Sequence, residues 1–61
     1  MTRKDYNLIA NAIATAKLNA NREERPIISR AASHIAYALR RDNPRFETAR
    51  FMDACGFSAT D

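Results

Sequence analysis

The sequence predicts an all-α domain of three helices, two long and one short. In two long segments apolar residues recur at steps of three and four, the spacing of a helix with one buried face. An Asn-Pro pair then stops the second segment, and the single glycine closes a shorter periodic run. Residues 1–61 therefore form one helical domain, with residues 58–61 expected to fray. The expected helices are Arg3–Asn19, Pro26–Arg41 and Thr48–Cys55.

The first helix has a start signal in Thr2 and Asp5. Their three-residue spacing is that of a capping box, and the acid suits the positive end of the helix dipole. An apolar face follows at helical steps. It consists of Tyr6, Ile9, Ile13, Ala16 and Ala20.

The start of the middle helix has two interpretations. Asn21 and Glu24 are placed to cap it ahead of Pro26, or the helix begins at Pro26 itself. Both arrangements lead into the same apolar stripe. That stripe consists of Ile28, Ala32, Ile35 and Leu39, flanked by Ala31 and Ala36.

The last helix is expected to begin with Thr48 as its N-cap and to stop at Gly56. Glycine adopts the left-handed conformation of a Schellman ending, in which Phe57 folds back onto Met52. We expect the three phenylalanines to form one cluster that closes the core. The predicted buried set is Ile9, Ile13, Ala16, Ile28, Ala32, Ile35, Leu39, Phe46, Phe51 and Met52, with Cys55 as a small buried side chain.

Several chemistries are disfavoured by composition. A single Cys permits no internal disulfide, and one Cys with one His cannot close a tetrahedral metal site. With one glycine there is no glycine-rich phosphate loop, and no nucleophile–base constellation is visible. We therefore expect a non-enzymatic protein with no catalytic residue, no metal site and no cofactor.

Chain length makes self-association the expected route to stability. A chain of 61 residues buries only about 60% of the surface of its unfolded form, and without a disulfide or a metal, oligomerisation is the remaining route to a larger buried surface. We expect a dimer packed through the first helix, because some of its apolar residues lie off the main stripe. The alternative is a monomer in which Leu18 points into water. The predicted interface residues are Leu8, Ala12, Thr15 and Leu18.

A candidate ligand or partner site lies on the opposite face of the middle helix. Arginines there are suited to clamp an anion, and a tyrosine offers a stacking face. The alternative is an ordinary solvated face. The chain has net charge +3 and eight Arg against two Lys, which fits either a phosphate-bearing or acidic partner or a GC-rich coding sequence. The candidate residues are Arg30, His34, Tyr37 and Arg41.

The two ends of the chain carry a resemblance to a widespread group of small orphan proteins of tailed bacteriophages. The matching residues are Arg3-Lys4-Asp5-Tyr6, Ile9-Ala10, Asp42-Asn43-Pro44-Arg45-Phe46, Arg50-Phe51 and Ala54-Cys55-Gly56. The group has no assigned chemistry, so the resemblance implies only a source and a lifestyle, that of a protein in the cytoplasm of an infected bacterial host. No export signal or membrane span is visible, and a free thiol fits that compartment.

Three classes of function remain open. The chain either occupies a host or defence-system protein, or sequesters a nucleotide or cyclic nucleotide as a small oligomer through Arg and Tyr, or binds nucleic acid as a regulator. Seven acidic residues are interleaved with the basic ones, and no helix has a dense basic stripe, which disfavours nucleic acid. The first class is the leading expectation.

Overall fold

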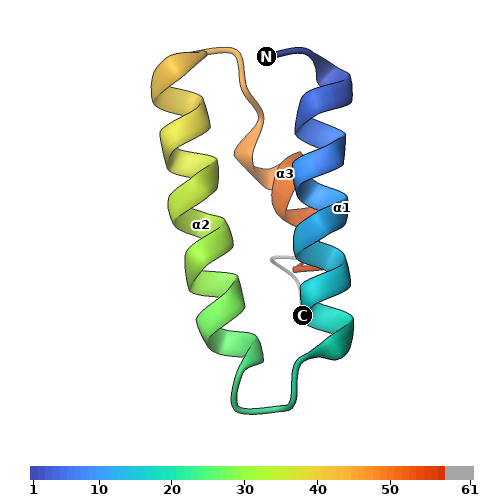
Figure 1. Cartoon of the computed structure of the whole chain (residues 1–61). Coiled ribbons are helices and arrows are strands. Elements are labelled where there is room, and N and C mark those ends of the chain that lie inside the picture. The colour runs from blue at the N-terminus through green and yellow to red at the C-terminus, as the bar shows by residue number, and fades with distance from the viewer. Residues whose placement is uncertain (58–61) are drawn as a thin grey trace.

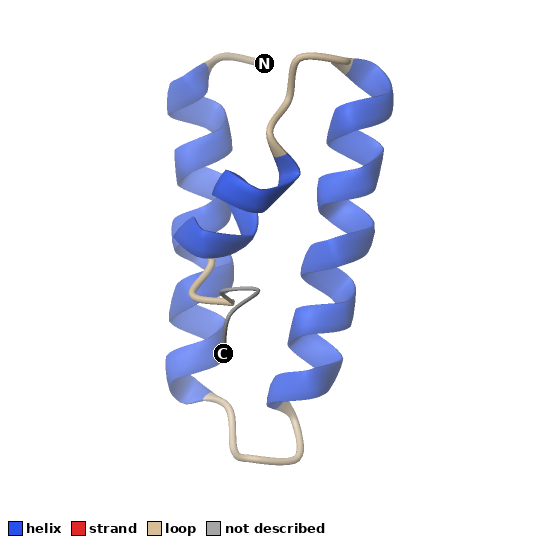
Figure 2. Cartoon of the chain, turned by 180° about the vertical axis from the view of Figure 1, so that it is seen from behind, coloured by secondary structure: helices blue, strands red, loops and turns tan. Residues whose placement is uncertain are grey.

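A computed structural model describes residues 1–57, which form three helices and no strand. The helices are α1 (Arg3–Asn19), α2 (Arg25–Asp42) and α3 (Thr48–Ala54). Helices α1 and α2 form an antiparallel pair, and the short α3 packs across one face of it (Figures 1 and 2). The predicted all-α class, with two long helices and one short helix, is confirmed for this part of the chain. The expected fraying of residues 58–61 lies outside the described residues.

The predicted capping box starts α1. The Asp5 amide donates to Thr2 Oγ1 at 3.4 Å, and the Thr2 amide donates to Asp5 Oδ2 at 2.9 Å. These reciprocal bonds satisfy two donors that a helix start would otherwise leave free. The observed bounds of α1 match the prediction.

Each of the two interpretations of the α2 start is confirmed in part. Asn21 Oδ1 accepts from the amides of Glu23 (3.0 Å) and Glu24 (2.9 Å), and Glu24 Oε1 accepts from the Asn21 amide (2.8 Å). This box orders the turn before the helix, whereas α2 begins at Arg25 with Pro26 in its first turn. The predicted helix was one residue too short at each end.

The predicted N-cap of α3 is wrong. Glu47, with extended backbone, occupies the cap position, and Thr48 is the first helical residue, with no side-chain cap bond at this end. Extended backbone is usual at an N-cap, but the Glu47 side chain pairs with Arg50 instead, with 3.6 Å between Oε2 and Nε.

The Schellman ending predicted at Gly56 is confirmed, and α3 itself ends at Ala54, one residue before the predicted Cys55. Gly56 has a φ of 91°, in the left-handed region. Its amide donates to the Asp53 carbonyl, and the Phe57 amide donates to the Met52 carbonyl, both at 2.9 Å. The ending is also held by α1, since Lys17 Nζ donates to the Gly56 carbonyl and lies 4.9 Å from the centre of the Phe57 ring.

Small side chains dominate the core. Alanines on α1 and α2 let Phe51 of α3, and Cys55 directly after it, lie close against both long helices. Larger apolar residues surround this centre and are only half-buried, including Ile9, Leu39 and Met52. The fully buried residues are Ala10, Ala32, Ala36, Phe51 and Cys55.

Two members of the predicted buried set are wrong. Ala16 is exposed, and Ile35 retains 37% of its surface. Both lie on the side of the α1–α2 pair that faces away from α3. Helix α3 covers the other side of the pair, where Ala10 and Ala36 are buried. Three of the predicted residues, Ala32, Phe51 and Cys55, are fully buried, and six are half-buried: Ile9, Ile13, Ile28, Leu39, Phe46 and Met52.

The aromatic residues divide between two places instead of forming one cluster. The Tyr6 ring meets Phe46 edge to face at 4.7 Å between centroids, and Phe46 lies 5.5 Å from Phe51. Phe57 packs against Lys17 at the far end of α3. Tyr6 therefore takes the place in the cluster that the sequence assigned to Phe57.

Candidate functional site

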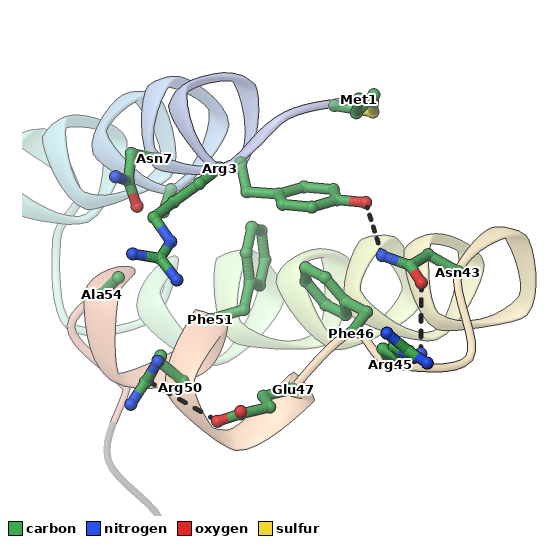
Figure 3. Close-up of a pocket in the computed structure, with 12 residues that line it drawn as sticks. Met1, Arg3, Asn7, Asn43, Arg45, Phe46, Glu47, Arg50, Phe51 and Ala54 are labelled. Carbon is green, nitrogen blue, oxygen red and sulfur yellow. Dashed lines mark hydrogen bonds and ion pairs between the residues drawn. The ribbon is translucent and has the colours of Figure 1, made fainter.

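A groove of about 330 Å³ lies between the start of α1 and the segment that runs from the end of α2 into α3 (Figure 3). We call it the arginine groove. Its lining combines aromatic, amide and basic side chains. The main lining residues are Arg3, Tyr6, Asn7, Asn43, Arg45, Phe46, Glu47, Arg50, Phe51 and Ala54.

The floor of the arginine groove is aromatic and held by one asparagine. Asn43 Nδ2 donates to Tyr6 Oη at 3.4 Å, and Asn43 Oδ1 accepts from the Arg45 amide at 3.2 Å. The Asn43 carbonyl also accepts from the Phe46 amide at 2.9 Å. Asn43 thus ends α2 and fixes the following loop against α1, which sets Phe46 beside Tyr6.

The rim carries three arginines from different parts of the chain. Arg3 comes from the start of α1, Arg45 from the loop and Arg50 from α3. In Figure 3, Arg3 and Arg50 lie toward one end and Arg45 toward the other.

Few acidic side chains offset the positive charge of these three arginines. Glu47 is the acidic residue of the lining, and its Oε2 lies 3.6 Å from Arg50 Nε. Both side chains are largely exposed, so solvent screens this pair and it holds Arg50 only weakly. Arg3 and Arg45 form no ion pair with any carboxylate among residues 1–57. The groove therefore has an uncompensated positive charge.

This arrangement is suited to binding an anion. A guanidinium presents a planar fork that binds a carboxylate or a phosphate through two hydrogen bonds. Of the residues that the structure describes, no serine, threonine, cysteine or lysine lines the groove. The nearby Cys55 thiol is fully buried, and burial raises its pKa, so it stays protonated at neutral pH. Residues 1–57 also contain no group of His, Cys, Asp and Glu that could hold a metal ion.

The sequence-predicted ligand site is an exposed stripe along α2. Arg30, His34, Tyr37 and Arg41 are all exposed. Tyr37 and Arg41 share a surface hollow with Arg40 and Pro44, whereas Arg30 and His34 do not line it. The structure thus brings two of the four predicted residues together, on an open surface.

The four predicted interface residues, Leu8, Ala12, Thr15 and Leu18, are also exposed in the single chain. Leu8 retains 70% and Leu18 81% of its surface, while the Thr15 hydroxyl donates within the helix to the Asn11 carbonyl. Their exposure leaves them free for a partner but does not define one.

Sequence reasoning missed the arginine groove, because its arginines are far apart along the chain. One signal was present: the Asn43-Pro44 stop, which returns the chain to the start of α1.

Within residues 1–57, no helix has the length and apolarity needed to cross a bilayer. Comparison of the chain with protein-family models, with curated proteins and with solved structures found no match.

Proposed function

We propose that the chain is a non-enzymatic binding protein and that the arginine groove receives an anionic group of its partner. One observation carries the proposal. Arg3, Arg45 and Arg50 line one groove with an aromatic floor, and the one carboxylate among its described lining residues, Glu47, is weakly paired with Arg50. Like charges around one groove repel one another, and an anionic segment that reaches Arg3 and Arg50 at one end and Arg45 at the other would relieve that repulsion.

The partner that we favour is a protein with an acidic segment. Arginine pairs bidentately with carboxylates, and the exposed edges of the half-buried Tyr6 and Phe46 offer apolar contact beside them. In this proposal the protein acts in the cytoplasm of a bacterial host, where it occupies a host or defence protein. The setting rests on the resemblance to phage proteins, and the binding mode rests on the groove.

A nucleotide is the second candidate ligand. The volume of the groove, about 330 Å³, is at the lower end of the range for small-molecule sites. Phosphate oxygens would contact the arginines, and the base would lie against Tyr6. Carboxylate and phosphate ligands share the same recognition chemistry, so the experiment has to separate them.

The test is an NMR titration of the isotopically labelled chain at low salt. Hexaglutamate, AMP and inorganic phosphate are added separately. Because all three arginines line one groove, we expect the Nε–H signals of Arg3, Arg45 and Arg50 to shift together, most strongly with the peptide. A larger response to AMP at equal concentration would favour the nucleotide, and a response equal to that of phosphate alone would show a simple ion site.

Two charge reversals provide a matched comparison. Arg3→Glu changes the groove, and Arg41→Glu makes the same change of charge on the exposed face of α2. We expect Arg3→Glu to weaken binding at least tenfold, about 1.4 kcal/mol, and Arg41→Glu to have a small effect. The reverse order would assign binding to the α2 stripe. No response to any of the three anions at millimolar concentration would contradict the groove proposal.

A further inference from the structure

Glu47 is the acidic residue of the arginine groove, and the start of α3 does not account for it. The residue holds the N-cap position, where a serine, threonine, aspartate or asparagine side chain would stabilise the helix by accepting from a free amide. The Glu47 side chain makes no such bond. Its carboxylate contacts Arg50 instead, at 3.6 Å from Nε, and it lies on the rim of the groove.

The charges of the lining follow a definite order along the groove. Arg3 and Arg50 lie toward one end and Arg45 toward the other (Figure 3). Glu47 lies between Arg50 and Arg45, both along the chain and in this view. It offsets part of the charge of Arg50, whereas Arg3 and Arg45 form no ion pair with a carboxylate of residues 1–57. The two ends of the groove are therefore positive, and a negative charge lies between them.

The Glu47 carboxylate repels any anion that is brought to this part of the rim. The side chain is 66% exposed, so solvent screens the repulsion without removing it. Direct contacts between exposed charges change a binding constant by up to about fivefold. Repulsion grows with the charge gathered at one place, so clustered negative charges are disfavoured more than separated ones.

We propose that Glu47 is a specificity-determining residue of the arginine groove and selects a segment whose two acidic side chains are separated by uncharged residues. This inference rests on the proposed function and names the charge pattern of the partner. One acidic side chain of the segment contacts Arg3, and the other contacts Arg45. Two adjacent acidic residues, or one phosphate, would instead place part of their charge against Glu47.

The middle of the groove suits the uncharged part of such a segment. Phe46 directly precedes Glu47 in the chain and forms the aromatic floor with Tyr6. Both rings are half-buried, so their exposed edges can contact apolar atoms of the segment. Backbone amides of the segment can donate to the Glu47 carboxylate, which turns a repulsive group into an acceptor for an uncharged ligand.

The experiment compares two hexapeptides of equal charge, each with two glutamates, four serines and blocked ends. The glutamates are adjacent in one peptide and separated by two serines in the other. Binding is measured at low salt from the Nε–H signals of Arg3, Arg45 and Arg50. We expect the parent chain to bind the peptide with separated acids about threefold more tightly.

Two neutralising variants test the role of Glu47. Glu47→Gln keeps the size of the side chain and removes its charge, and the absence of a capping bond means that the helix start loses no partner. Asp53→Asn makes the same change of charge on an exposed residue of α3 that does not line the groove. We expect Glu47→Gln to bind the adjacent peptide about threefold more tightly than the parent does, which abolishes the preference, whereas Asp53→Asn retains it.

Three results would overturn the inference. One is equal affinity of the parent chain for the two peptides, another is a preference that survives Glu47→Gln, and the third is an equal loss of preference in Asp53→Asn. If Arg3→Glu weakens the binding of both peptides in any of these cases, the proposed function stands without the inference. A parent chain that binds neither peptide, or binding that Arg3→Glu leaves unchanged, would overturn both.

Discussion

At the scale of single residues, Gly56 has the clearest role. Its φ of 91° is accessible to glycine at little cost, and this conformation aligns the two amide bonds that end α3. A Cβ added there would lie 3.3 Å from Lys17 Cδ and Nζ. The end of the lysine side chain can move, so the main cost of a substitution comes from the backbone.

We expect Gly56→Ala to lower the free energy of unfolding by about 1 kcal/mol, because alanine disfavours the left-handed region. Chemical denaturation of the parent and the variant measures this difference. Gly56→Asn is the control, since asparagine tolerates that conformation better and should cost less. Equal stabilities for the parent and Gly56→Ala would contradict a structural role for the positive φ.

At the scale of elements, the long helices and the short α3 are stabilised by different kinds of interaction. Helix α1 has its own capping box, and the Asn21–Glu24 box orders the turn into α2. Helix α3, with seven residues, is too short to persist alone and depends on Lys17 and on its packing. Local interactions therefore define α1, and tertiary contacts maintain α3.

The α1 capping box predicts a pH dependence. Hydrogen bonds from the Thr2 amide, and then from its hydroxyl, lower the pKa of Asp5 below its usual value. The stability that this shift contributes is present above the usual pKa of the carboxyl and is lost as pH falls through the lowered one. Asp5→Asn should flatten the acid limb of a plot of melting temperature against pH.

Thr2→Ala is the partner variant for this measurement. It removes the hydroxyl that shares the box, so it should flatten the same limb by a smaller amount. If the parent and Asp5→Asn lose stability in parallel below pH 4, the capping box does not contribute to the acid limb.

At the scale of the whole molecule, α3 completes a single core. Phe51 and Cys55 enter between α1 and α2, and alanines on both helices make the close approach possible. Cys55 retains none of its surface, so a reagent can reach its thiol only when α3 leaves the pair. Its reactivity therefore reports the separation of α3 from the α1–α2 pair.

We expect iodoacetamide at pH 8 to alkylate Cys55 at least about a hundredfold more slowly in the folded protein than in denaturant. Burial blocks access, and the raised pKa of the thiol lowers the thiolate fraction. Mass spectrometry follows the reaction. Gly56→Ala should accelerate it in proportion to the lost stability, and equal rates in folded and denatured protein would contradict the buried position.

The sequence by itself determined those features that depend on neighbours along the chain. The Thr2–Asp5 box, the stop at Pro44 and the left-handed Gly56 each involve residues within a few positions of one another. Apolar periodicity likewise identified all three helices and their order. These interactions are local, so they can be inferred without knowing how the helices pack.

Only the tertiary structure decided the direction in which each helix is buried. Periodicity defines an apolar stripe on each helix, but the stripe is wide, so periodicity does not say which part of it the other helices cover. Phe46 and Phe51 bring α3 to one face of the pair, and this choice buries Ala10 and Ala36 while it exposes Ala16 and Ile35. The same packing gathers Arg3, Arg45 and Arg50 into one groove. The physical reason is that burial and convergence depend on long-range contacts, whose direction no local spacing encodes.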